Sequence, residues 1–438
     1  KFTDGGELNL ADLKDLSGKE LTMTEELKAA IRELSGVELR EGSICLDVDK
    51  TLLYKEEDIA KTAKKLGISK EELEKKQVRK AAEILGKLLE LTKISIISGN
   101  EASKQWKRLI AHIAKNLKAK GKLELIGRLT LYANGGASKV KFAVEAGEVK
   151  IINDKEHDQA FTLKEEHIAS IERFINKIVQ SGKLVELYQE EISKKLGREV
   201  TIEEVREILE LTLDGEVKNP KRELKALNYG WIYGKEWQTQ RQDVNNLNPE
   251  RACPWIEMRG LEGVIVQVTV KILVSELIVK SKGEEQVIEI GSGLRNKIID
   301  LAEAEGILPQ EFTLRPAGTG SIDIGASKDA AVNDFIETNE EVKRENVIYA
   351  GDEFTFRGND APVVNVEGIN VVSVGGKKSQ AEKGKAGKFI IAGELPDYTW
   401  IILEALAVLG NPENNNFQEL SKFFNNDAVS LIIQVFNW

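Results

Sequence analysis

The stretch Ser43-Ile44-Cys45-Leu46-Asp47-Val48-Asp49-Lys50-Thr51 decides which fold we expect. Residues 37–46 are strand-like and end in the apolar run Ile44-Cys45-Leu46. Two acidic residues, Asp47 and Asp49, follow this run. A second apolar strand, Val347–Ala350, is also followed by acidic residues, namely Asp352, Glu353 and Asp360. In an open parallel sheet, ligands bind in the crevice outside the carboxyl ends of the strands. We therefore expect these carboxylates to converge at one edge of a sheet.

Strands and helices alternate on both sides of this stretch. Two further short apolar runs, 94–97 and 129–133, end in Ser98-Gly99-Asn100 and Asn134-Gly135-Gly136, where glycine permits a tight turn. Apolar residues at helical spacing predict helices at 56–91, 101–118, 328–338 and 399–409. Such alternation is typical of the α/β class with a parallel sheet.

The pattern changes after residue 138. Residues 140–152 alternate like a hairpin, residues 163–213 are helical and highly charged, and strands return between 255 and 290. This pattern indicates an α+β domain inserted into the α/β core. The predicted divisions are an N-terminal helical extension (1–40), the first part of the core (41–138), the insertion (139–318), the second part of the core (319–410) and a C-terminal extension (411–438).

Composition narrows the possible classes of protein. With 438 residues and 41% hydrophobic content, the chain can bury large cores. A net charge of -10, with no clustered basic surface, argues against a nucleic-acid partner. The longest apolar stretch, 263–279, is interrupted by charged residues, so we expect no membrane association. Two cysteines give no disulfide framework, which predicts a reducing, cytoplasmic location; the oligomeric state stays open.

The ordered set of motifs resembles the haloacid dehalogenase (HAD) superfamily of aspartate-nucleophile phosphatases. The set is Asp-x-Asp-x-Thr, a strand-terminal Ser, Asn-Gly-Gly, a long insertion, Ser-Lys-Asp-Ala-Ala, and Gly-Asp-Glu before Gly-Asn-Asp. It is similar to the branch with a large cap between the second and third motifs, which includes sugar phosphatases and phosphomannomutases. The resemblance spans roughly residues 42–138 and 312–375, and it implies a Rossmann-like core with an inserted cap.

This resemblance implies chemistry at the acidic residues. Asp47 is the expected nucleophile, and Asp49 would protonate the leaving oxygen and later take a proton from water. A phosphate monoester is anionic, so a carboxylate attacker needs a cation beside it. Mg²⁺ prefers oxygen ligands. The expected metal residues are Asp47, Asp49 through its backbone carbonyl, Asp352 and, closer to the outer shell, Asp360.

Other residues are expected to contact the substrate, a small phosphorylated molecule. Ser98 would donate its hydroxyl to a phosphate oxygen, and Lys328 would balance the charge of the transferring group. Thr51 is expected to brace the loop, with a backbone contact to phosphate, while Asn134 either binds substrate or stabilises a turn. Arg259, in a segment similar to a cap strand of phosphomannomutases, is a candidate substrate contact or a surface salt bridge.

The sequence departs from the family pattern in two places and leaves two alternatives. Lys50 stands where many members have Gly, and the Gly-Arg expected soon after the phosphomannomutase-like cap strand is absent. We expect a Mg²⁺-dependent phosphatase acting on a sugar phosphate. The first alternative is a phosphosugar mutase with the same Asp47 and Asp49, and the second is a catalytically weak binding or scaffold protein.

Overall fold

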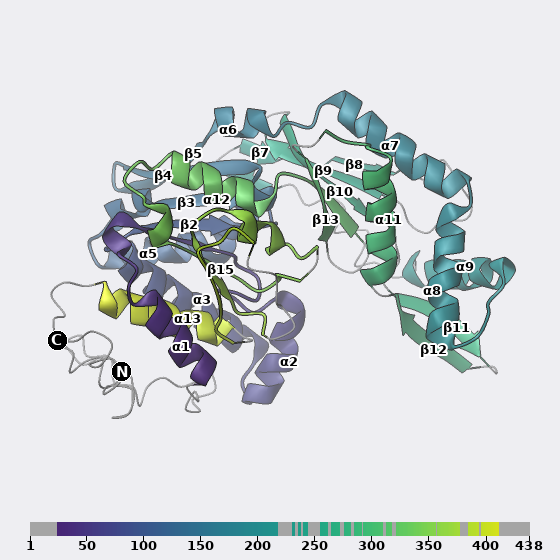
Figure 1. Ribbon diagram of the computed structural model, residues 1–438, viewed down its shortest axis with the longest axis horizontal. Coiled ribbons are helices and arrows are strands. Elements are labelled where there is room, and N and C mark those ends of the chain that lie inside the picture. Colours follow the sequence, from purple (N-terminus) through teal and green to yellow (C-terminus); the bar gives the residue numbers. More distant parts are fainter. Residues whose placement is uncertain are drawn as a thin grey trace. The chain divides into compact units, whose positions relative to one another are not determined.

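The computed structural model describes residues 24–217, 230–232, 235–237, 240–243, 255–261, 264–271, 276–281, 284–290, 292–309, 312–317, 321–355, 357–376, 384–393 and 396–410. The predicted C-terminal extension (411–438) and residues 1–23 of the N-terminal extension lie outside these ranges. The chain divides into two compact units, residues 1–153 with 328–438, and residues 154–327 (Figure 1). We call them the core unit and the inserted unit.

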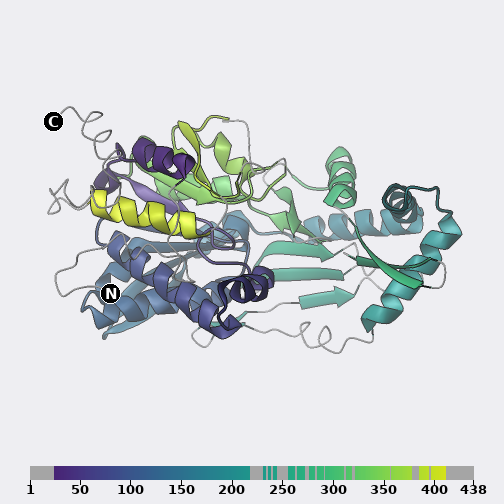
Figure 2. The same ribbon diagram turned by 90° about the horizontal axis from the view of Figure 1, so that it is seen from below.

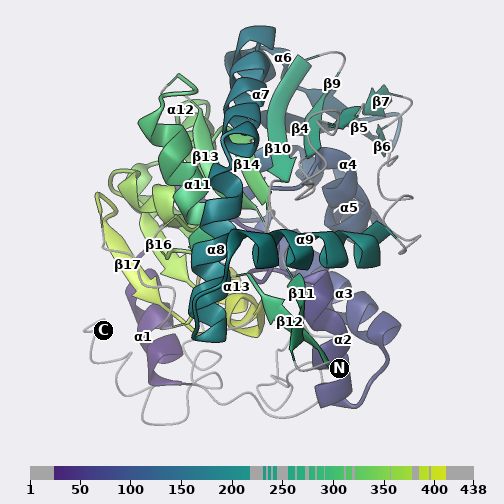
Figure 3. The ribbon, with the colours of Figure 1, turned by 90° about the vertical axis from the view of Figure 1, so that its right-hand side faces the viewer.

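The core unit is built on a sheet of order β17-β16-β15-β1-β2-β3-β4-β5. The strands from β17 to β3 are parallel, and the hairpin β4–β5 continues the sheet antiparallel (β16 and β17 are labelled in Figure 3). The α/β class with a largely parallel sheet is thus confirmed. The strands are β1 (Ser43–Leu46), β2 (Lys93–Ile97), β3 (Leu129–Ala133), β4 (Ser138–Glu145), β5 (Glu148–Asn153), β15 (Val347–Gly351), β16 (Asn370–Ser373) and β17 (Lys388–Ile391).

The first domain boundary falls later than the sequence pattern indicates. Residues 139–153 were expected in the insertion, but strands β4 and β5 pair with β3 and extend the core sheet. The inserted unit therefore begins at Asp154. It ends at Ser327, whereas residues 319–327 were expected in the core, because β14 pairs with β10 and β13 in the inserted sheet. The physical reason is that an alternating hairpin can pair with any open sheet edge, so its sequence does not say which sheet it joins.

Helices cover both faces of the core sheet. Helix α13 packs between α1 and α3, and α3 also packs against α5 (Figure 2), while α12 packs near β2 on the side that buries Cys45 and Tyr349. These helices are α1 (Glu25–Leu34), α2 (Glu56–Leu66), α3 (Lys70–Leu88), α4 (Ala102–Gln105), α5 (Ala111–Ala119), α12 (Lys328–Glu337) and α13 (Pro396–Leu409). Short turns of 3₁₀ helix lie at Leu39–Glu41, Leu123–Arg128, Asn134–Gly136, Arg344–Asn346 and Ala361–Asn365, and one π-helical turn lies at Trp106–Ile110.

The helical stretch expected at 56–91 is divided into two helices. Helix α2 ends at Gly67, whose φ of 70° lies in the left-handed region that glycine adopts without strain. Helix α3 then begins after Ser69, whose side chain accepts a hydrogen bond from the backbone N–H of Glu72. No helix among the described residues has the length and apolar character needed to cross a membrane.

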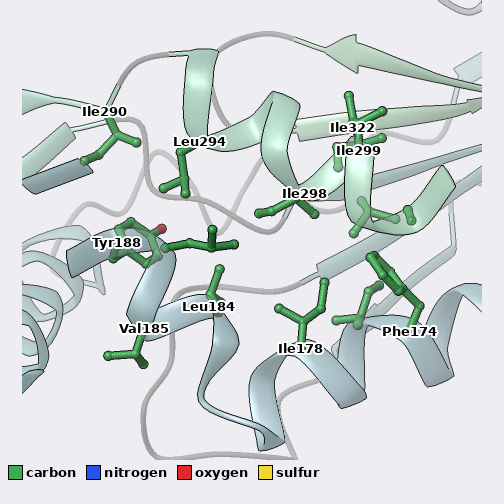
Figure 4. Packing of buried hydrophobic residues seen from close by; sticks show 14 of the residues in the cluster. Phe174, Ile178, Leu184, Val185, Tyr188, Ile290, Leu294, Ile298, Ile299 and Ile322 are labelled. Carbon is green, nitrogen blue, oxygen red and sulfur yellow. The ribbon is translucent and has the colours of Figure 1, made fainter. Parts of the chain in front are cut away.

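The inserted unit has its own antiparallel sheet, of order β13-β14-β10-β9-β8, and its own apolar core. Phe174 and Ile178 of α7, and Tyr188 of α8, face Leu294 and Ile298 of α11 (Figure 4). The helices are α6 (Lys155–Ala160), α7 (Glu165–Gln180), α8 (Lys183–Leu196), α9 (Ile202–Val217) and α11 (Ser292–Ala304). The strands are β6 (Gly230–Ile232), β7 (Lys235–Trp237), β8 (Gln240–Asp243), β9 (Trp255–Leu261), β10 (Val264–Lys271), β11 (Glu276–Ser281), β12 (Glu284–Glu289), β13 (Thr313–Ala317) and β14 (Ser321–Gly325).

Candidate active site

The register of the core sheet brings the acidic segments together. Leu46 of β1 pairs with Ala350 of β15, so the residues after both strands leave the sheet at the same edge. The backbone N–H of Asp47 donates to the carbonyl of Ala350 at 3.0 Å, which extends the ladder by one residue. Carboxylate oxygens of Asp47, Asp352 and Asp360 lie within 4.8 Å of one another. The expected convergence of these three side chains is present in the structure.

Lys328 supplies positive charge to this cluster. It begins α12, is fully buried, and its Nζ lies 2.8 Å from Asp47 Oδ1 and 2.6 Å from Asp360 Oδ1. Burial alone would lower the pKa of Lys328, but Asp360 and Asp47 more than offset this effect and raise it. The ammonium group is therefore charged at every pH of interest and bridges two carboxylates.

Asp360 is already fully engaged by donors within the protein. Its Oδ1 accepts from Lys328 Nζ at 2.6 Å and Tyr349 Oη at 2.5 Å, and its Oδ2 accepts from the backbone N–H groups of Asp352 and Glu353 at 3.0 and 2.8 Å. A carboxylate offers about four lone-pair positions, so these donors occupy its capacity. Asp360 is better placed to hold Lys328 and the Asp352 backbone than to be a direct metal ligand.

Gly351 is required where the β15 loop meets Asp360. A Cβ atom at this position would lie 2.6 Å from the Asp360 carboxyl carbon, closer than real contacts allow. The glycine before Asp352 in the motif therefore makes room for the Asp360 carboxylate.

Two of the three carboxylates have raised pKa values. Burial raises the pKa of Asp47 to about 7 against the opposing pull of Lys328, and burial with the negative charge of Asp360 and Asp47 raises the pKa of Asp352 to about 9. Burial also acts to raise the pKa of Asp360, but Lys328, Tyr349 and the Glu353 backbone N–H more than offset it, so this pKa is lowered. Lys328 forms ion pairs with two of these carboxylates, Asp47 and Asp360. The oxygen-only donor set and its deficit of positive charge fit a hard divalent cation.

Asp49 lies in a different environment from Asp47. Its side chain is 27% exposed, and its Oδ1 accepts from an Nη of Arg108 at 2.5 Å while its Oδ2 accepts from Asn100 Nδ2 at 2.8 Å. The other Nη of Arg108 donates to the carbonyl of Tyr54 at 3.0 Å. Sequence reasoning missed both partners. Asn100 stood in the Ser98-Gly99-Asn100 motif and could have been noticed, but Arg108 lies 59 residues from Asp49 and carries no sequence signal for this contact.

Ser98 is placed at the end of β2 as expected. Its backbone N–H donates to the carbonyl of Tyr132, and its Oγ accepts from the N–H of Asn100 at 3.1 Å and from Gln105 Nε2 at 2.7 Å. Because the hydroxyl oxygen accepts these two bonds, its own hydrogen is left to be donated. This geometry is compatible with a hydroxyl donor to phosphate, and Gln105 is a further residue that sequence reasoning missed.

Asn134 and Thr51 lie in the loops without a visible polar role toward substrate. Asn134 is buried in a turn with φ of 53°, and its Nδ2 donates to Ser138 Oγ at 3.1 Å, which supports the turn interpretation. Thr51 is also buried, and its Oγ1 has no hydrogen-bond partner among the described residues. A brace by its hydroxyl is therefore not seen, and the side chain contributes packing.

The Asp47 loop is fastened by side chains from α3 and α13. Trp400 Nε1 donates to the carbonyl of Leu52 at 2.9 Å, and Tyr54 Oη donates to Asp397 at 2.5 Å. The Tyr54 backbone N–H donates to Gln77 Oε1 at 2.7 Å. These contacts, none of which the sequence indicated, fix the segment that carries the acidic pair.

Arg259 belongs to the inserted unit. It lies on β9, is half-buried, and pairs across the sheet with Gln267 of β10. Its predicted contact with substrate stays a prediction.

Comparisons with known proteins give neighbours among solved structures alone. No family model and no curated protein sequence matches the chain. The chain is similar to the IMP-bound, N-terminally truncated IMP-nucleotidase of Plasmodium falciparum, with 12% identity, a TM-score of 0.42, and 86% of this chain and 70% of that chain covered. It is also similar to the HAD subclass IIB sugar phosphatase BT4131 (13% identity, TM-score 0.35, 84% and 99% covered) and to the HAD-superfamily phosphatase BT1666 of Bacteroides thetaiotaomicron (13%, 0.36, 84% and 95%). Identities and TM-scores at this level assign no activity to the chain, so its function is inferred below from the site.

Proposed function

We propose that this chain is a Mg²⁺-dependent phosphatase that hydrolyses a small phosphorylated metabolite, with a sugar phosphate as the substrate class. One observation carries the proposal. Asp47 lies at the carboxyl end of the central strand, is 6% exposed, and shares a cluster with Lys328 and two further carboxylates. This is the arrangement that an aspartate nucleophile needs, because a carboxylate attacking an anionic ester requires fixed positive charge beside it.

In the first half of the reaction, a carboxylate oxygen of Asp47 attacks phosphorus and the bond from phosphorus to the ester oxygen breaks. The leaving oxygen takes a proton from Asp49, which lies two residues further along the same loop and is accessible to solvent. Lys328 offsets charge on the transferring group, and the Ser98 hydroxyl donates to one of its oxygens. The product of this half is an aspartyl phosphate on Asp47 and a free alcohol.

In the second half, water attacks phosphorus and gives its proton to the Asp49 carboxylate. The bond between phosphorus and Asp47 breaks, inorganic phosphate leaves, and both aspartates return to their starting states. Bound Mg²⁺ would supply charge neutralisation for the phosphoryl oxygens. Asp47, Asp352 and the backbone carbonyl of Asp49 would hold it, with Asp360 behind them because its oxygens are already engaged.

The test is Asp47→Asn, assayed for Mg²⁺-dependent release of phosphate from an aryl phosphate and from a panel of sugar phosphates and nucleoside monophosphates, including IMP. We expect loss of turnover with an unchanged circular dichroism spectrum. Asp58→Asn is the matched control, because it removes a carboxylate from α2 instead of from the cluster. Retained activity in Asp47→Asn would reject the mechanism.

The same panel separates the two alternatives. Interconversion of hexose 1- and 6-phosphates without net release of phosphate would indicate a phosphosugar mutase. Turnover near background with every substrate would favour a binding or scaffold protein. Nothing in the described residues favours either alternative over hydrolysis.

A further inference from the structure

Arg108 contacts two points of the segment that carries Asp49. One Nη donates to Asp49 Oδ1 at 2.5 Å and the other donates to the Tyr54 carbonyl at 3.0 Å, so a single guanidinium joins both ends of the segment 49–54. A planar guanidinium presents several donors in a fixed fork, which suits it to hold two acceptors at once. A lysine ammonium on a flexible stem would fix this geometry less well.

The second oxygen of Asp49 is held by Asn100, which lies eight residues before Arg108. Asn100 Nδ2 donates to Asp49 Oδ2 at 2.8 Å, and Lys104 Nζ donates to Asn100 Oδ1 at 3.0 Å. The lysine contact turns the amide so that its nitrogen faces Asp49. Both carboxylate oxygens of Asp49 are therefore fixed, one by Arg108 and one by Asn100.

Local backbone geometry places Arg108 in this position. Arg108 lies in the π-helical turn Trp106–Ile110 between α4 and α5. Such turns insert an extra residue into an α-helix and redirect the side chains that follow, and they are frequent at functional sites. The Arg108 and Asp49 side chains are 20% and 27% exposed, and ion pairs in contact with solvent add little to the stability of a fold. A contribution to the stability of the fold therefore does not explain why Arg108 lies beside Asp49.

We propose that Arg108 is the positioning residue for Asp49, and that it clamps the segment 49–54 so that this carboxylate faces the leaving oxygen. The inference rests on the proposed phosphatase function. One oxygen of Asp49 accepts a hydrogen bond from Arg108 and the other accepts one from Asn100. Each oxygen keeps a further lone pair for the transferred proton. Arg108 acts through Asp49 and does not itself contact the reacting atoms.

This role makes a specific kinetic prediction. When Asp49 is misplaced, the ester oxygen must leave without a proton, which penalises poor leaving groups far more than good ones. General acid catalysis contributes about 10²–10⁴-fold. In Arg108→Met, kcat/KM should therefore fall about 100-fold for an alkyl phosphate and less than about 10-fold for p-nitrophenyl phosphate. The value of kcat/KM is used because it reports the steps up to departure of the leaving group.

The experiment compares the wild-type chain with Arg108→Met, Arg108→Lys and the control Lys107→Met, which removes an exposed cation from the same turn. Arg108→Lys should recover part of the alkyl phosphate activity, and Lys107→Met should match wild type with both substrates. Equal losses for alkyl and aryl phosphates in Arg108→Met would overturn the proposal, because a merely structural defect does not depend on the leaving group.

Hydrogen exchange gives a readout that does not require turnover. The backbone N–H groups of Lys50, Leu52 and Leu53 donate within the segment, to the carbonyls of Leu53 and Val48. Arg108→Met should raise amide exchange in this segment about 5-fold, while Lys107→Met leaves it unchanged. If the wild-type chain hydrolyses no phosphate ester, the proposed function fails. Exchange then decides the clamp separately, because unchanged protection in Arg108→Met would reject it.

Discussion

Asp47 and Asp49 lie in one loop, and each forms an ion pair with a basic residue from another segment. The two ion pairs differ in burial. The side chain of Lys328 is 0% exposed and pairs with the side chains of Asp47 and Asp360, which are 8% and 0% exposed. Asp49 lies two residues after Asp47, and the side chains of Arg108 and Asp49 are 20% and 27% exposed. A nucleophile gains from exclusion of water, whereas a residue that exchanges protons needs a path to solvent. Neighbours in sequence are thus placed in unlike surroundings, and the unlike surroundings suit the unlike roles we propose.

The largest expected effect comes from removing the buried cation. Lys328→Met leaves Asp47 and Asp360 buried without their counter-ion, which should cost about 3–5 kcal/mol of unfolding free energy and abolish turnover. Arg108→Met, in the partly exposed pair, should cost no more than about 1 kcal/mol. Urea denaturation of both variants measures the contrast. Similar losses in the two variants would contradict the distinction between the pairs.

The second prediction separates a metal ligand from a residue that holds its neighbours. Asp352→Asn should weaken Mg²⁺ binding by about 10–100-fold with little loss of stability, because it removes a ligand whose charge is costly in the empty site. Asp360→Asn should chiefly destabilise the fold, because Lys328, Tyr349 and two backbone N–H groups lose a charged acceptor. Isothermal titration with Mg²⁺ and thermal unfolding measure the two effects. The reverse pattern would make Asp360 the ligand.

The third prediction concerns pH in the absence of metal. The raised pKa values of Asp47, about 7, and Asp352, about 9, mean that the folded protein binds more protons than the unfolded chain between about pH 4 and 9. Their stabilising contribution is complete below about pH 4 and is lost as pH rises through 7 and 9. The Tm of metal-free protein should fall by about 5 °C or more from pH 6 to pH 9, and saturating Mg²⁺ should remove most of this slope. A metal-free Tm that rises over this interval would contradict the placement of these carboxylates.

The smallest expected effect is at Lys50, the residue that follows Asp49 in the Asp47 loop. Its φ of 61° is in the left-handed region, where side chains other than glycine are strained. Lys50→Gly should relieve this strain but also raise the conformational entropy of the unfolded chain. We therefore expect the free energy of unfolding to rise by at most about 1 kcal/mol. Lys50→Ala is the control and should give no gain, because alanine keeps the Cβ atom. Guanidinium denaturation distinguishes the two variants.

Much of the core could be predicted from sequence because its signals are local. The apolar run before Asp47 and the one before Asp352 each announce a buried strand, and parallel pairing then brings their ends together. Lys328 was found because it stands in an ordered set of motifs, and the structure places its Nζ against Asp47. The departure at Lys50 from the glycine of the family pattern also has a physical counterpart in its positive φ.

The residues that sequence reasoning missed act across long separations. Arg108 reaches Asp49 only because a π-helical turn redirects it, and Trp400 reaches the Leu52 carbonyl from the last described helix. Asp360 was expected to be near the metal, but its oxygens are occupied by donors from Lys328 and from residues 349–353. Periodicity reports which face of an element is buried, but it does not report what that face meets.

The sequence by itself determined the α/β class, the insertion and the set of acidic residues at the strand ends. These follow from short-range patterns of apolar and polar residues, which set strand and helix identity. The tertiary structure alone decided that β4 and β5 join the core sheet, that Asp360 is satisfied within the protein, and that Arg108 holds Asp49. Each of these depends on burial and on tertiary contacts, and such contacts exist only once the chain has folded.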